Sequence, residues 1–177
     1  MNLAKLSFRA AEGHEIAGIV SLVNSAYRGE SGKQGWTTEA DLLDGQRTDV
    51  EEITRLLAVE DSMILLGIWD GEAVASVHLE KHAEGAYLGM LAVKPGLQGR
   101  GIGRRVLAAA EQTAQREWRA AKVLMTVITL RHELIDFYLR CGYLRTGRVR
   151  PFPVSEKFGI QKVHGLLLEY LEKPIAI

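Results

Sequence analysis

The sequence predicts a three-layer α/β fold in a single domain that spans residues 1–177. Strand-like and helix-like segments alternate along the chain in the order β-α-α-β-β-β-α-β-α-β-β. This mixture of short hairpins and longer crossovers requires both parallel and antiparallel strand pairs. The size agrees with this, because 177 residues, of which 47% are hydrophobic and 25% charged, are typical of one globular domain with a core of ordinary size.

The N-terminal part of the chain reads as one strand, one helix and a loop. Residues 3–10 alternate apolar and polar side chains, which predicts a strand. The helix is predicted from apolar residues at helical spacing, namely Ile16, Ile19, Val20, Val23 and Tyr27. The following residues 28–36 contain three glycines and are predicted to form a loop.

Two capping boxes come next and predict two further helices. Thr38 and Asp41 resemble a box that opens a short helix at residues 39–43. Asp49 and Glu52 resemble a second box, which opens a longer helix.

The rest of the chain starts with strand periodicity and then alternates. Asp70-Gly71 stands between two apolar runs, which is a strong signal for a β-hairpin. Strands are predicted at residues 62–69, 72–81, 86–93, 122–128, 144–149 and 162–171. Helices are predicted at residues 102–118 and 133–140, and Gly142 closes the second of them.

The charge balance and the single cysteine exclude several classes of protein. Lys plus Arg equals Asp plus Glu at 22 each, so bulk attraction to nucleic acid or to an anionic membrane is not expected. One cysteine, Cys141, rules out an internal disulfide framework. No apolar run approaches the roughly 20 residues of a membrane helix. We therefore expect a soluble, cytoplasmic protein.

The sharpest motif lies between a predicted strand and a predicted helix, and it consists of Gln98, Gly99, Arg100, Gly101, Ile102 and Gly103. Glycines at alternate positions let the backbone turn tightly and approach a ligand. The free N–H groups at a helix start suit a phosphate or a pyrophosphate. Arginines at positions 100, 104 and 105 add positive charge for phosphate oxygens.

Three other interpretations compete for this loop. A dinucleotide site has the spacing G-x-G-x-x-G, whereas this loop has G-x-G-x-G. A P-loop has Lys and then Ser or Thr after its last glycine, whereas Arg104 follows here. A glycine-rich turn without a ligand is the third alternative.

With its neighbours, the loop resembles the GNAT superfamily of acyl-CoA-dependent N-acyltransferases. Residues 88–104, LGMLAVKPGLQGRGIGR, are similar to the family's strand, glycine loop and helix start. Residues 134–143, LIDFYLRCGY, are similar to its later short helix. The resemblance implies a three-layer α/β/α acyl-CoA N-acyltransferase fold with a mixed, largely antiparallel central sheet.

The resemblance also implies roles for matching positions. The backbone of Leu91, Ala92 and Val93 would pair with the pantetheine arm as an added strand does. The pyrophosphate would be held by Gln98, Gly99, Arg100, Gly101, Ile102, Gly103 and Arg104. Tyr138 would protonate the departing thiolate. Many family members have Asn at the position of Arg131, so Arg131 either reaches the coenzyme or is solvated.

For several candidate catalytic side chains, the sequence leaves both a catalytic and a structural role open. Tyr138 lies on an apolar helical stripe, so it is either a core residue or the general acid. Cys141 is expected to be a small packed residue rather than a nucleophile, because direct attack of an amine requires none. A general base, if one is used, would be His78 or Glu80, which share a strand face with Ser76.

The acceptor site is expected in residues 28–44 and 152–159. Trp36, Glu39, Asp41 and Asp44 would suit a cationic amine, although Glu39 and Asp41 could equally stabilise a helix start.

Three hypotheses follow. The first is an N-acetyltransferase that uses acetyl-CoA, no metal, and a small-molecule or protein amine. The second is a non-catalytic acyl-CoA sensor or scaffold, and the third is a site for another nucleotide. An unpaired strand edge near the C-terminus could mediate a homodimer.

Overall fold

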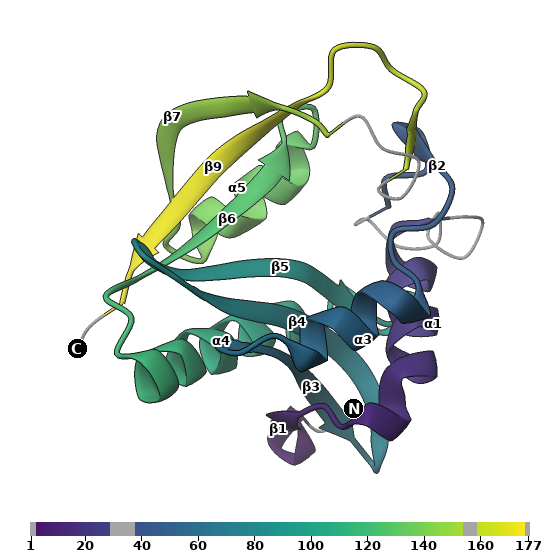
Figure 1. The fold of residues 1–177 in the computed structure, drawn as a ribbon, viewed down its shortest axis with the longest axis vertical. Coiled ribbons are helices and arrows are strands. Elements are labelled where there is room, and N and C mark those ends of the chain that lie inside the picture. Colours follow the sequence, from purple (N-terminus) through teal and green to yellow (C-terminus); the bar gives the residue numbers. More distant parts are fainter. Residues whose placement is uncertain (1–2, 29–37, 154–158, 176–177) are drawn as a thin grey trace.

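The computed structural model describes residues 3–28, 38–153 and 159–175 of the chain. Within these residues, one sheet of seven strands carries helices on both of its faces (Figure 1). Its strands, in spatial order, are β1 (Ser7–Ala10), β3 (Ser62–Trp69), β4 (Glu72–His82), β5 (Gly85–Val93), β6 (Lys122–Ile128), β9 (Leu167–Pro174) and β7 (Leu144–Pro151). The α-helices are α1 (Ile16–Tyr27), α3 (Val50–Ala58), α4 (Ile102–Trp118) and α5 (His132–Arg140).

Only one neighbouring pair in this described sheet is parallel, and it is the pair β5–β6. The prediction of a mixed, largely antiparallel sheet is therefore confirmed. The strands β5 and β6 pair at Ala86 with Val123 and at Tyr87 with Leu124. Beyond these pairs β6 continues along β9 as far as Ile128, so the later part of β5 has an open edge on the β6 side. The glycine-rich turn before α4 follows this edge.

Two apolar clusters fill the space between the sheet and the helices. On one face, α1 and α3 pack on β3 and β5 through residues such as Ile19, Ile53, Leu66 and Ala92. On the other face, α4 and α5 pack through Val106, Leu107, Ile135 and Tyr138. The three-layer arrangement follows, because each side of the sheet presents alternate side chains to a different pair of helices.

Most predicted elements agree with the structure. The strands Ser62–Trp69 and Lys122–Ile128 and the helix Ile102–Trp118 have the predicted bounds. The second capping box is confirmed at its main contact, because the Asp49 carboxylate accepts a 2.7 Å hydrogen bond from the Glu52 backbone N–H.

The short helix predicted at residues 39–43 is wrong. The Thr38 hydroxyl does accept a hydrogen bond from the backbone N–H of Ala40, but the chain then makes a turn and enters strand β2 (Leu43–Asp44). This strand pairs antiparallel with β8 (Ile160–Gln161). Tertiary packing decides the outcome, because Leu43 is buried in a small cluster with Ile128, Leu166 and Leu168.

The first and the last strand of the chain begin later than predicted. Residues Leu3–Lys5 form a 3-10 turn, and β1 begins at Ser7. The last predicted strand began at residue 162, whereas β9 begins at Leu167. None of the helices in the described residues has the length and apolarity that a membrane crossing needs.

Candidate active site

The helix α4 begins in a glycine turn that follows β5. Gly99 and Gly101 have φ angles of 75° and 83°, in the left-handed region where a side chain costs about 1–2 kcal/mol. The Gln98 side-chain amide donates a 3.1 Å hydrogen bond to the Val93 carbonyl, which ties the turn to β5. The first turn of α4 has no acidic residue, so its free N–H groups and the positive end of its dipole suit an anion.

A cavity of about 390 Å³ lies beside this turn. Of the residues predicted for the coenzyme, those that line the cavity are Leu91, Val93, Gln98, Gly99, Gly101, Ile102, Gly103 and Arg104. Ala92 is not part of this lining, and its buried side chain packs in the cluster with α1 and α3. Arg100 is exposed and is not part of this lining. The coenzyme contacts of all these residues remain predictions.

Four lining residues had no predicted coenzyme role. They are Tyr27 from α1 and Leu134, Phe137 and Arg140 from α5. Arg140 adds a guanidinium to a cavity that Arg104 and Arg131 also line, which increases the positive charge available to phosphate oxygens. The last turn of α5 contains this arginine, but an arginine near a helix end is too common to have marked a site in the sequence.

A β-bulge shapes the open edge of β5. Met90 and Leu91 together face Val77 of β4, since the register shifts between the pairs Ser76–Ala92 and His78–Gly89. Met90 has a φ of 47°, a strained conformation for a residue with a side chain. The Tyr27 hydroxyl donates a 2.7 Å hydrogen bond to the Leu91 carbonyl. The bulge therefore turns the backbone of Leu91 toward α1 and the cavities.

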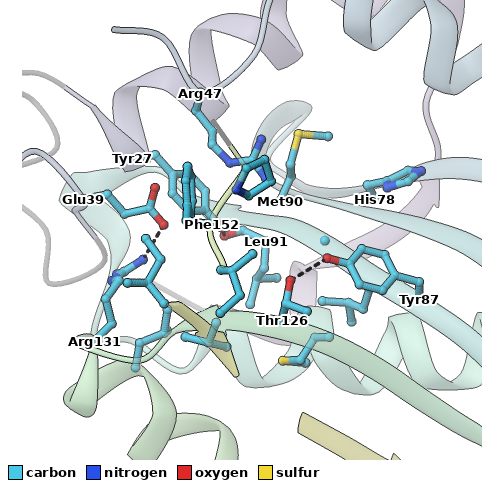
Figure 2. Close-up of a pocket in the computed structure, with 18 of the residues that line it drawn as sticks. Tyr27, Glu39, Arg47, His78, Tyr87, Met90, Leu91, Thr126, Arg131 and Phe152 are labelled. Carbon is cyan, nitrogen blue, oxygen red and sulfur yellow. Dashed lines mark hydrogen bonds and ion pairs between the residues drawn. The ribbon is translucent and has the colours of Figure 1, made fainter. Parts of the chain in front are cut away.

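A second cavity of about 490 Å³ lies beyond the bulge (Figure 2). Its walls come from α3, β4, β5, β6 and α5 and from residues 150–153. The two cavities share five of their lining residues, which are Tyr27, Leu91, Arg131, Leu134 and Tyr138. The cavities therefore meet at one junction, which could receive one substrate from each side.

Tyr138 combines the two interpretations that the sequence left open. Its ring packs edge-on against Phe137 and Tyr143, with centroid distances of 5.4 and 5.8 Å, so it belongs to the core. It also lines both cavities. Burial raises the pKa of its hydroxyl above the usual value of 10, so the hydroxyl keeps its proton at neutral pH. The role of Tyr138 as general acid remains a prediction.

His78 is fixed in one tautomer at the side of the second cavity. The Ser62 hydroxyl donates to the Leu56 carbonyl at 2.7 Å, so the 3.0 Å contact with His78 must be a bond from Nε2–H to Ser62 Oγ. Burial lowers the pKa of His78 to about 4, with a smaller effect from Arg55. The imidazole is therefore neutral at pH 7, and its Nδ1 is an acceptor. Glu80 also lines this cavity, whereas Ser76 is buried outside it.

The acidic residues predicted for a cationic amine lie in different places. Glu39 lines the second cavity, but it is buried and paired with Arg28 and, at 3.1 Å, with Arg131. Asp41 and Asp44 are exposed and are not in the lining. Trp36 lies outside the described residues. The solvated alternative for Arg131 is wrong, because this residue is only 8% exposed.

Cys141 is partly buried next to the first cavity. Burial raises the pKa of its thiol, and the contact with Arg104 opposes this effect. A thiol with a raised pKa is a poor nucleophile at neutral pH, which agrees with a packing role. Within the described residues, no group of three or more His, Cys, Asp and Glu side chains could hold a metal ion.

The sequence matches the model of a known protein family. A family model described as "Acetyltransferase (GNAT) family" matches residues 34–143, a span that contains β5, the glycine turn, α4, β6 and α5. No curated protein is a significant match to the sequence.

Many solved structures share the fold. The ribosomal-protein-S18-alanine N-acetyltransferase from Escherichia coli has a TM-score of 0.70 at 13% identity and covers 97% of this chain and 95% of its own. The spermidine N-acetyltransferase from Vibrio cholerae, in complex with CoA and spermine, has a TM-score of 0.71 at 14% identity, with coverages of 97% and 96%. The ribosomal-protein-alanine N-acetyltransferase from Brucella melitensis has a TM-score of 0.70 at 18% identity, with coverages of 96% and 100%.

The family model spans more than half of the chain and includes both motifs that the sequence pointed to. The glycine turn, the bulged strand and the two joined cavities lie within or next to this span. The chain belongs to the GNAT family of acetyltransferases.

Proposed function

We propose that this chain is an N-acetyltransferase that moves an acetyl group from acetyl-CoA to an amine by direct attack in a ternary complex. The junction of the two cavities at Leu91 and Tyr138 carries the proposal. A ternary mechanism needs two substrates to enter from separate directions and to meet beside an acid. Both cavities also have volumes in the range of small-molecule sites, which is about 300–1,000 Å³.

The first cavity fits the donor. The N-terminus of α4 and the guanidinium groups of Arg104 and Arg140 would bind the pyrophosphate. The pantetheine arm, which contains peptide-like amides, would run along the open edge of β5. The carbonyls of Leu91 and Val93 already accept hydrogen bonds from Tyr27 and Gln98, so backbone N–H groups of this edge are the expected coenzyme contacts.

The chemistry follows from the groups at the junction. The amine nitrogen attacks the thioester carbon, the C–N bond forms, and the C–S bond breaks with its electron pair on sulfur. The Tyr138 hydroxyl donates a proton to that sulfur, and a backbone N–H of β5 stabilises the oxyanion. The amine also loses a proton. This proton passes through water to solvent, and solvent returns a proton to the Tyr138 oxygen. His78 Nδ1 can accept a hydrogen bond from such a water, because the imidazole, with a pKa of about 4, is neutral at pH 7.

The structural neighbours do not identify the acceptor. One is named for spermidine and another for an alanine of a ribosomal protein. At 13% and 14% identity these likenesses concern the fold alone. The acceptor must therefore be inferred from the side chains of the second cavity.

The test is release of free thiol from acetyl-CoA over a panel of amines, with the acetylated product identified by mass spectrometry. Turnover with at least one amine, lost in Tyr138→Phe, is the expected result. Tight coenzyme binding without turnover across the panel would instead favour a non-catalytic acyl-CoA sensor.

A thermal-shift assay provides an independent check on the donor. A ligand at 100 times its Kd stabilises the folded state by about 2.7 kcal/mol. We expect this stabilisation with CoA and acetyl-CoA. A shift with ATP or NAD but none with either coenzyme form would contradict the proposal.

A further inference from the structure

The second cavity contains more positive than negative charge. Its lining includes the arginines Arg47, Arg55, Arg131 and Arg150, and Arg28 lies behind Glu39. Against the four lining arginines stand three glutamates, Glu39, Glu52 and Glu80. The described lining therefore has an excess of one positive charge, and Arg28 adds a second behind it. His78 adds none at neutral pH, because its pKa is lowered to about 4.

Two of the three glutamates are already neutralised. The Oε1 and Oε2 atoms of Glu39 each accept a hydrogen bond from an arginine. Glu52 binds Arg55 through two hydrogen bonds of 3.1 and 2.9 Å. A carboxylate whose oxygens are taken by guanidinium groups attracts a further cation weakly. The cavity is therefore a poor match for a polycationic acceptor.

Several of the arginine donors remain available. Among the described residues, neither Arg47 nor Arg150 has a carboxylate partner. Nη2 of Arg131 is buried without a hydrogen-bond partner in the same part of the chain. A buried donor without a partner is costly, which favours an anionic ligand at this wall.

Arg47 is held in position by contacts that do not include a carboxylate of the described residues. Its backbone N–H donates a 2.7 Å hydrogen bond to Asn24 Oδ1, and its guanidinium lies 5.6 Å from the ring centroid of Tyr27. Tyr27 lines the junction of the two cavities. Figure 2 shows Arg47, Tyr27 and Arg131 toward one end of the cavity and His78 toward the other.

On the basis of the proposed function, we infer that the acceptor is an amine that also carries a carboxylate, as a free amino acid does. Arg47 and Arg131 bind the carboxylate, and the amine then faces the junction. A guanidinium group is the preferred partner of a carboxylate, because its planar donors match both oxygens. Arg150 is exposed, so we assign it no direct role.

The first experiment compares acceptors that differ in one charge. Initial rates of acetyl-CoA consumption are measured with free amino acids, with their amides, and with spermidine. We expect kcat/KM to be about 10- to 100-fold higher for an amino acid than for its amide. The amide has the more acidic ammonium group and hence the larger fraction of neutral amine at pH 7, so this preference cannot come from ionisation.

The second experiment assigns the preference to Arg47. Arg47→Gln should remove most of the acid-over-amide ratio, and Arg47→Lys should restore part of it. Arg55→Gln is the matched control, because Arg55 lines the same cavity but is paired with Glu52, and its ratio should stay within about 3-fold of the wild type. Thermal unfolding and coenzyme affinity of each variant separate binding effects from misfolding.

The outcomes distinguish this inference from the proposed function. Acetylation of spermidine or of the amides with equal or greater kcat/KM would overturn the inference and leave the N-acetyltransferase function intact. An unchanged ratio in a folded Arg47→Gln variant would overturn the role of Arg47. Thiol release with none of these amines, despite coenzyme binding, would count against the proposed function itself.

Discussion

Tyr138→Phe isolates the hydroxyl of Tyr138, because phenylalanine keeps the ring. The edge contacts with Phe137 and Tyr143 should persist in the variant. No hydrogen bond from this hydroxyl to another described residue is lost. We therefore expect the free energy of unfolding to change by less than about 1 kcal/mol.

The expected kinetic effect is much larger than the effect on stability. Loss of a general acid typically costs about 10²–10⁴-fold in rate. A thiolate is a fair leaving group, so we expect the lower end, about 100-fold in kcat or about 2.7 kcal/mol. Burial raises the pKa of Tyr138, so it should cause no alkaline decline of kcat below about pH 10 in the wild type.

The assay is steady-state thiol release, together with coenzyme affinity by calorimetry. Tyr143→Phe is the matched control, because Tyr143 touches the Tyr138 ring but bonds to Glu111 at 3.1 Å and lines neither cavity. The control should lose stability and retain kcat. A Tyr138→Phe enzyme with kcat within about 2-fold of the wild type would refute the reasoning.

Three further predictions concern stability. The pKa of His78 is lowered to about 4, so the imidazole of the unfolded chain takes up a proton first as the pH falls, and the free energy of unfolding should be full above pH 6.5 and about 2 kcal/mol lower at pH 5 than at pH 7. Urea unfolding should show a smaller loss for His78→Gln, and equal pH dependence in the two proteins would contradict this prediction. Gly101→Ala places a side chain at a positive φ and should lower the free energy of unfolding by about 1–2 kcal/mol, whereas Gly103→Ala should lower it little, because a Cβ there meets its nearest atom at an ordinary 3.5 Å. Equal losses in thermal unfolding would contradict this prediction. Glu39→Gln leaves buried arginines without their carboxylate and should lower the free energy of unfolding by about 3–5 kcal/mol, whereas Lys5→Gln, in an exposed pair, should lower it by no more than about 1 kcal/mol. Similar Tm values for the two variants would argue against the buried cluster.

The features that sequence could predict are those set by local rules. The helix Ile102–Trp118 follows from its apolar spacing, and the turn before it follows from glycines whose φ angles only glycine adopts easily. The hairpin at Asp70-Gly71 follows from turn chemistry, and Asp70 and Gly71 both have the positive φ angles that such a turn requires.

The features that escaped prediction depend on contacts between distant segments. Residues 39–43 contain helix signals, but pairing of β2 with β8 and burial of Leu43 override them. The sequence left Arg131 either at the coenzyme or in solvent, whereas the fold buries it next to Glu39, 92 positions away in sequence. Tyr27 joined the site only because α1 packs on β5 at the bulge.

The same reason explains why the donor could be predicted and the acceptor could not. The glycine loop that we propose for the donor is one continuous segment whose glycine spacing is visible in the sequence. The second cavity collects side chains from α3, β4, β5, β6 and α5. No spacing within a linear sequence encodes such a set.

The central claim is that an amine attacks acetyl-CoA directly where the two cavities meet. An initial-velocity study that varies both acetyl-CoA and an amino acid acceptor tests it most directly. Direct attack predicts double-reciprocal lines that intersect, and no acetylated enzyme when acetyl-CoA is added alone. Parallel lines, together with acetyl transfer to Cys141 in the absence of acceptor, would contradict the claim, because they indicate a covalent intermediate.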